Sequence, residues 1–187
     1  MKKIISILLA GLTMITLFGC ANKETSTKQN SKNVKEEINY VAYGNGENSG
    51  NWNIKINNVC QVNEVAKKDG GKFTADGKFI NILLDMKNIS KNPVSYSLTD
   101  FKLKDISTGK IYSIEDVGYE VAQELISEEK FYKKNEKYIT IMDKVNPDKA
   151  KIACISFDVS KDIKLDNLVL INKNEGSDSK TVQFKLK

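Results

Sequence analysis

The 187-residue chain contains no histidine and no arginine. Histidine is the usual general base near neutral pH and the commonest zinc ligand, so its absence excludes Ser-His-Asp and Cys-His catalytic sets within this chain. Arginine reads phosphates and guanine edges through two hydrogen bonds at once, and no lysine-rich stripe with interleaved aromatic residues takes its place. We therefore expect no nucleic-acid partner, and only lysine or carboxylate chemistry remains for an enzyme.

The charge of the chain is mild. All 29 basic residues are lysines, they stand against 24 acidic residues, and the net charge is +5. Lysines spread in this way are typical of solvated strand faces. We expect no catalytic residue, no metal site and no cofactor from these patterns.

An apolar run near the N-terminus is too short to cross a bilayer. Lys2 and Lys3 precede residues 4–18, which are apolar apart from a few small or hydroxyl residues. As a helix this run would rise about 22 Å, whereas the hydrocarbon core of a bilayer is about 30 Å thick. Residues 1–19 are therefore predicted to be a removable signal peptide.

The run ends in Leu17-Phe18-Gly19-Cys20. This segment resembles a bacterial lipobox, in which a small residue precedes the cysteine that receives diacylglycerol, although Phe18 is bulkier than the residue usually found there. Two cleavage sites fit: before Cys20, which gives a lipidated N-terminus, or after Ala21, which gives an unmodified protein. We favour the first, because a cysteine at this point is otherwise hard to explain. Two or three acyl chains on Cys20 would then hold the protein stably on the membrane.

The chain after the signal peptide divides into a spacer and one domain. Between residues 21 and 37 only Ala21 and Val34 are apolar, so this stretch buries too little surface to offset the entropy of ordering it. We predict a lipidated cysteine and a disordered tether over residues 20–39. Residues 40–187 are enough for a single domain of ordinary size.

Short segments of alternating apolar and polar residues separated by turns predict an all-β domain. The strongest is 78–88, where Ile80, Ile82, Leu84 and Met86 fall on one face. Polar stretches at 40–51 and 67–77 are predicted to be loops. Strands are expected at 52–57, 78–88, 94–98, 101–103, 111–112, 138–142, 150–159, 168–171 and 181–186. Seven to nine short strands predict an antiparallel, immunoglobulin-like β-sandwich.

One segment has a helical period instead. Val117, Val121 and Leu125 are spaced by four, which predicts a short amphipathic helical insertion over residues 116–129. Gly118 weakens this helix, because glycine is a poor helix former.

Three segments in order resemble a known family: 82–90 (ILLDMKNIS), 100–105 (DFKLKD) with 109–112 (GKIY), and 146–150 (NPDKA) leading into 155–159 (ISFDV). They are similar to the telokin-like, immunoglobulin-type domain of many Gram-positive lipoproteins and secreted immunoprotective antigens. Asp148 stands where that family usually has glycine, and Ser160 where it usually has proline. The resemblance implies the sandwich fold and carries no catalytic residue with it, since fold does not give function.

Cys60 and Cys154 remain once Cys20 is lipidated. An even pair outside the membrane permits a disulfide, which by its loop length would stabilise the fold by about 4–5 kcal/mol. The alternative is two thiols in separate strands, because spacing alone does not show whether two sulfurs meet.

Acidic residues lie beside glycine or in pairs at several places: Asp69-Gly70-Gly71, Asp76-Gly77, Glu47-Asn48, Glu115-Asp116 and Glu128-Glu129. None fits the alternating carboxylates of a calcium loop, and neighbouring residues do not face each other as an acid–base pair must. Solvated turns and exposed charges are the favoured interpretation.

Aromatic side chains offer either core packing, which is the commoner use, or a binding surface. The candidates are Trp52, Tyr96, Tyr112, Tyr119, Tyr132 and Tyr138. The favoured function is a lipid-anchored, non-enzymatic binding domain at the outer face of the cell membrane, with an unknown protein or envelope ligand as partner. The alternative is a small-ligand or solute-binding accessory of an envelope transport or sensing system, which requires a pocket with convergent polar groups.

Overall fold

The computed structural model describes residues 39–173 and 180–187. The predicted signal peptide, Cys20 and nearly all of the predicted tether lie outside these residues. Among the helices in the described ranges, none has the length and apolar character needed to span a membrane.

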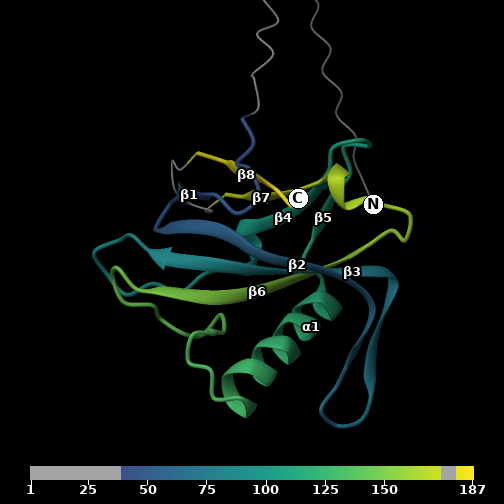
Figure 1. Ribbon diagram of the computed structural model, residues 1–187, viewed down its shortest axis with the longest axis horizontal. Coiled ribbons are helices and arrows are strands. Elements are labelled where there is room, and N and C mark those ends of the chain that lie inside the picture. The colour runs from purple at the N-terminus through teal and green to yellow at the C-terminus, as the bar shows by residue number, and fades with distance from the viewer. Residues whose placement is uncertain (1–38, 174–179) are drawn as a thin grey trace, which may run out of the picture. The chain divides into compact units, whose positions relative to one another are not determined.

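Two four-stranded antiparallel sheets form the described fold (Figure 1). The first has the strand order β1-β2-β3-β6, with β1 Gly46–Ser49, β2 Trp52–Ala66, β3 Lys72–Asn88 and β6 Ala150–Val159. The second has the order β5-β4-β7-β8, with β5 Ile111–Ser113, β4 Phe101–Asp105, β7 Leu168–Asn172 and β8 Val182–Lys185. The predicted antiparallel β-sandwich is confirmed.

The core fills the space between the two sheets. The residues predicted to share one face of β3 are fully buried, and β6 supplies Ala153, Ile155 and Phe157 beside them. The second sheet contributes Leu103, Leu170 and Phe184 to the same cluster. Burying a large apolar side chain stabilises a fold by roughly 1.5–3 kcal/mol, so this layer supplies most of the stability.

The predicted helical insertion is confirmed as α1 (Asp116–Ser127), which continues into a wider π-helical turn over Glu128–Tyr132. Figure 1 shows α1 on the outer face of the β2-β3-β6 layer, away from the second sheet. Val121 packs with Phe79 of β3, and Ile126 packs with Cys154 of β6. The first sheet is therefore buried on both faces where the helix covers it.

Gly118 is the residue that lets α1 lie this close to the sheet. A Cβ atom built at Gly118 would stand 2.5 Å from the carbonyl oxygen of Ser156 in β6. Helix propensity alone makes this glycine unfavourable, so its place in the helix is explained by packing.

The hairpin of β2 and β3 is much longer than the sequence pattern predicted. Residues 67–77 were expected to form a long turn, but β3 already begins at Lys72 and the turn is confined to residues 67–71. Two register shifts, between Ile56 and Asn58 and between Val62 and Glu64, break the simple alternation. Bulges of this kind hide a strand from a period-2 pattern and bend it.

Three further predictions about strands were wrong. The predicted loop 40–51 contains strand β1. The predicted strand 94–98 forms only a bridge between Val94 and Val145, and the predicted strand 138–142 only a bridge between Tyr138 and Ile152. Within 138–142, the Asp143 carboxylate accepts hydrogen bonds from the backbone N–H and the hydroxyl of Thr140, which closes a tight turn.

Asp148 has a backbone φ of 60°, the left-handed region that glycine adopts at no steric cost. It is the position at which the resembling family usually has glycine. Aspartate is among the few residues that tolerate this conformation, so the turn forms here without glycine.

Replacing Gly118 by alanine should lower the free energy of unfolding by about 1–3 kcal/mol, because the new methyl group overpacks against the Ser156 carbonyl. Helix propensity predicts the opposite sign, a gain of about 1 kcal/mol. Urea unfolding measures the difference, with Glu120→Ala on the exposed side of the same helix as the control. A stabilised Gly118→Ala protein would contradict the close packing.

Candidate functional site

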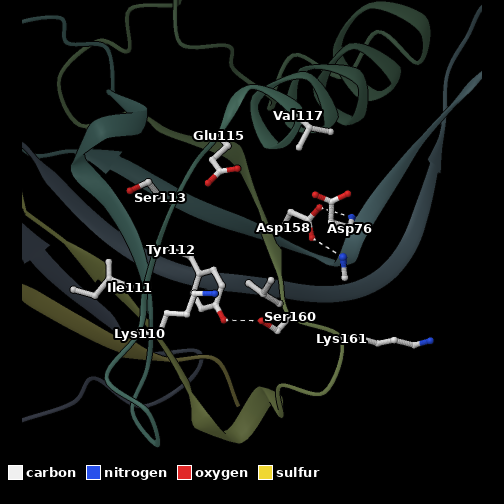
Figure 2. Close-up of a pocket in the computed structure, with 12 residues that line it drawn as sticks. Asp76, Lys110, Ile111, Tyr112, Ser113, Glu115, Val117, Asp158, Ser160 and Lys161 are labelled. Carbon is white, nitrogen blue, oxygen red and sulfur yellow. Dashed lines mark hydrogen bonds between the residues drawn. The ribbon is translucent and has the colours of Figure 1, made fainter.

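A surface groove lies between the edge strand β5 and the end of β6, beside the start of α1 (Figure 2). Its volume is about 470 Å³. The residues that line it come from four parts of the chain: Asp76 and Gly77 of β3, residues 110–113, Glu115 and Val117 at the start of α1, and residues 158–161. We call this cavity the β5 groove.

One wall of the β5 groove is held in place by Asp158. Its carboxylate accepts hydrogen bonds from the backbone N–H of Asp76 at 2.7 Å and of Gly77 at 3.2 Å. These bonds replace ladder partners where the β2–β3 pairing shifts register. A Cβ atom at Gly77 would stand 2.1 Å from the carbonyl oxygen of Val159, so only glycine permits this approach.

Tyr112 lines the β5 groove at the end away from Asp76. Its hydroxyl lies 3.3 Å from the hydroxyl of Ser160, and the Lys110 ammonium lies 4.5 Å from the centre of its ring. Beyond this contact lies a second hollow of about 440 Å³, which also borders Lys110, Tyr112 and Ser160. The Tyr112–Ser160 contact therefore separates two neighbouring hollows.

Asp105 shapes the second hollow. Its carboxylate accepts hydrogen bonds from the backbone N–H and hydroxyl of Ser107, at 2.9 and 2.6 Å, and from the hydroxyl of Thr108 at 2.7 Å. Those hydroxyl bonds lower the pKa of the Asp105 carboxyl below its usual value, because they favour the ionised form. Asp105 thus holds the β4–β5 turn that borders both hollows.

The β5 groove presents two carboxylates without partners. Within the described part of the chain, the side chains of Asp76 and Glu115 make no hydrogen bond or ion pair. Figure 2 shows Glu115 directed into the space between Tyr112 and the helix, whereas Lys161 extends away from it. This end of the groove suits a ligand that brings hydrogen-bond donors and positive charge.

The structure does not bring Cys60 and Cys154 together. Both are free, Cys60 exposed and Cys154 buried. They lie on β2 and β6, on opposite sides of β3, where they stand opposite Asn81 and Leu83 respectively. Strands are spaced by about 4.8 Å, so the two backbones are about 10 Å apart and beyond the reach of a disulfide. Burial raises the pKa of the Cys154 thiol to about 12.

The acidic positions singled out in the sequence are scattered. Asp69 closes the β2–β3 turn by accepting the N–H of Gly71 at 3.0 Å, and Glu47 lies in β1. Glu128 and Glu129 form ion pairs with lysines, among them Lys133. Groups of three or more potential metal ligands are absent from residues 39–173 and 180–187. Of these positions only Asp76-Gly77 and Glu115 border the β5 groove.

The aromatic candidates divide between the core, the β5 groove and the exposed surface. Trp52 and Tyr96 belong to the core, with 3% and 4% of their surfaces exposed. Tyr112 is partly buried and borders the β5 groove. Tyr119 and Tyr132 are exposed, the latter by 60%. Burial of Tyr138 raises the pKa of its hydroxyl.

Sequence reasoning missed Asp158 and Asp105 as organisers of the site. Both lie in the segments that carry the family resemblance, ISFDV and DFKLKD, where the apolar alternation drew attention to their neighbours. An aspartate on a strand next to buried residues is a usable signal, because a carboxylate there needs donors close by. Asp105 is followed by a serine and a threonine that supply them.

Fold and site together define an antiparallel β-sandwich with a polar groove where one edge of each sheet comes close. A family described as "Domain of unknown function (DUF4352)" matches residues 42–181. The match covers most of the described domain and well over half of the chain, and the chain belongs to this family. No curated protein is similar enough to the chain to count as a match.

Several solved structures are similar to the chain. The yjhA protein from Bacillus subtilis is 16% identical, with a TM-score of 0.50 over 79% of this chain and 99% of that one. A conserved hypothetical protein from Bacillus anthracis is 16% identical, with a TM-score of 0.51 over 76% and 94%. An uncharacterized β-sandwich protein from Clostridium difficile is 19% identical, with a TM-score of 0.47 over 82% and 98%. At these identities the first two structures show the shared fold alone.

Replacing Asp105 by asparagine should lower the free energy of unfolding at pH 7 by about 1 kcal/mol, because a charge-assisted hydrogen-bond acceptor is lost. Since the pKa of Asp105 is lowered by folding, its contribution is complete above the ordinary carboxyl pKa of about 3.9 and disappears as the pH falls through the lowered value. Urea unfolding between pH 7 and pH 2 measures this, with exposed Asp162→Asn as the control. A difference from wild type that persists undiminished at the lowest pH would contradict this role for the charge.

Proposed function

We propose that the chain is a lipid-anchored protein of the outer face of the cell membrane whose β-sandwich is a non-enzymatic binding domain. The β5 groove is its binding site. Lipid on Cys20 supplies the membrane attachment, and the following residues to about position 39 act as the spacer. The resemblance to telokin-like domains of Gram-positive lipoproteins agrees with this proposal.

The observation that carries the binding role is the pair of unpartnered carboxylates, Asp76 and Glu115, in an open groove. Both residues are exposed to solvent, and a small number of polar groups lining a concave site is typical of recognition. The wall that carries Asp76 is held by the Asp158 bonds, so the groove is formed before any ligand arrives. A preformed site loses less entropy on binding.

The filled interior favours this function over a solute carrier. Side chains from both sheets occupy the space between them, among them Phe101, Phe157 and Phe184, each about 1% exposed or less. A carrier of this fold would need to enclose its ligand, as larger barrels do. The surface groove suits a partner that stays partly outside.

Replacing Cys20 by serine should release the protein from the membrane. A hydroxyl at this position receives no acyl chain, and the remaining apolar run is too short to anchor the protein. Fractionation of producing cells measures it: we expect wild type in the membrane pellet and in detergent extracts, and Cys20→Ser in the medium. Ala21→Ser is the control for the neighbouring position. A Cys20→Ser protein that sediments with the membrane would contradict the lipid anchor.

Photo-crosslinking on intact cells tests the binding site. A photoreactive phenylalanine analogue at exposed Ser113, in the β5 groove, should give a discrete covalent adduct. The same analogue at exposed Lys91, which does not line the β5 groove, should give none. Equal adducts at both positions, or none at Ser113 in a protein that is correctly exported, would contradict binding at the groove.

A further inference from the structure

Strand β5 has a free edge along the β5 groove. It pairs with β4 on one side, with Leu103 opposite Tyr112, and the Asp105 N–H donates to the Lys110 carbonyl at 2.9 Å. In an antiparallel ladder alternate residues turn their backbone groups to the partner. Lys110 and Tyr112 therefore bond to β4, while Ile111 and Ser113 direct their N–H and C=O groups outward.

Two other sheet edges are covered in part by the chain itself. Val41 bonds to β8 through its N–H to Gln183 at 2.8 Å and accepts from Lys185 at 2.9 Å. At the start of β6, Ile152 exchanges bonds with the segment at residues 137–139. In the described part of the chain no segment does this for Ile111 and Ser113 of β5. Uncovered edge groups are a template for an additional strand.

The charges of the groove indicate what kind of strand fits. The unpartnered carboxylates of Asp76 and Glu115 line the same cavity as the outward groups of Ile111 and Ser113. The Ile111 side chain is 53% exposed, which is high for isoleucine in a strand, and offers an apolar contact. An incoming extended segment would pair with the outward backbone groups of β5. Its apolar side chains would contact Ile111, and its basic side chains would meet the carboxylates.

We propose that the β5 groove binds an extended peptide segment of another protein, which adds to the free edge of β5 and places a lysine or arginine side chain between Asp76 and Glu115. This proposal rests on the binding role proposed above and specifies its ligand. Backbone hydrogen bonds to Ile111 and Ser113 supply the pairing. The two carboxylates select for positive charge, because a basic group there gains charge-assisted hydrogen bonds.

A displayed library of random peptides of about nine residues, the length of a long strand, is the probe. It is selected on the full-length protein in detergent micelles, and affinities are measured by fluorescence anisotropy with labelled synthetic peptides. We expect enrichment of sequences in which a lysine or arginine stands among β-branched residues. Exchanging that basic residue for glutamate should weaken binding at least about tenfold.

Two sets of variants separate backbone pairing from charge. Ile111→Pro removes one outward N–H and leaves the β4–β5 ladder intact, since proline is tolerated where an edge N–H faces solvent. Ile111→Thr keeps that N–H and is its matched control. We expect about tenfold weaker binding for Ile111→Pro and less than threefold for Ile111→Thr, with thermal midpoints reported for both. Asp76→Asn with Glu115→Gln should remove the preference for basic peptides over their glutamate versions.

Three results would overturn the proposal. Enriched peptides that bind Ile111→Pro as tightly as Ile111→Thr would place the peptide elsewhere, and the general binding role would survive. Spermidine or calcium that competes fully with the peptides at low concentration would make the groove a site for free cations. No enrichment, while the Ser113 photo-crosslink still forms on cells, would show a partner recognised by a folded surface. Failure of that crosslink as well would remove the proposed function itself.

Discussion

Strand β3 buries side chains on both of its faces, and the other elements are arranged around this constraint. Ile80, Ile82 and Leu84 face the second sheet, whereas Phe79 faces α1. A strand with two apolar faces needs a cover on each side, since leaving either one in water would lose the burial energy of several large side chains. The helix supplies the second cover, and Gly118 sets how close it lies.

The β5 groove is a consequence of the same arrangement. Because α1 begins directly after β5, the chain must pass from the edge of one sheet to the outer face of the other. The passage leaves a hollow at the open side of the sandwich, beside the shifted register of β3. Asp158 stabilises that wall through backbone N–H groups that have lost their ladder partners. A structural requirement and the proposed recognition surface therefore occupy the same place.

The proposed binding role depends on both the sandwich core and the edge strand β5. The sandwich core holds β5 and the Asp105 turn rigidly, which allows a short strand to present its backbone groups without large ordering costs. A short edge strand also limits pairing between copies of the chain, since three residues offer few hydrogen bonds to an unselected partner. The proposed charge selection by Asp76 and Glu115 adds a second condition that an unselected strand does not meet.

The elements predicted correctly from the sequence have a local signal: the alternation of 78–88 and 150–159, the four-residue spacing of α1, and the turn at Asn146-Pro147-Asp148. It also supported the sandwich class, which follows from many short strands and turns. Three features depend on contacts between distant segments: the bulges within the long β2–β3 hairpin, the reduction of 94–98 and 138–142 to single bridges, and the separation of Cys60 from Cys154 across β3. The groove belongs to the same group, because Asp76, Glu115 and Asp158 meet there from three distant parts of the chain. Local periodicity reports which face of one element is apolar, whereas register, edges and hollows depend on which elements become neighbours.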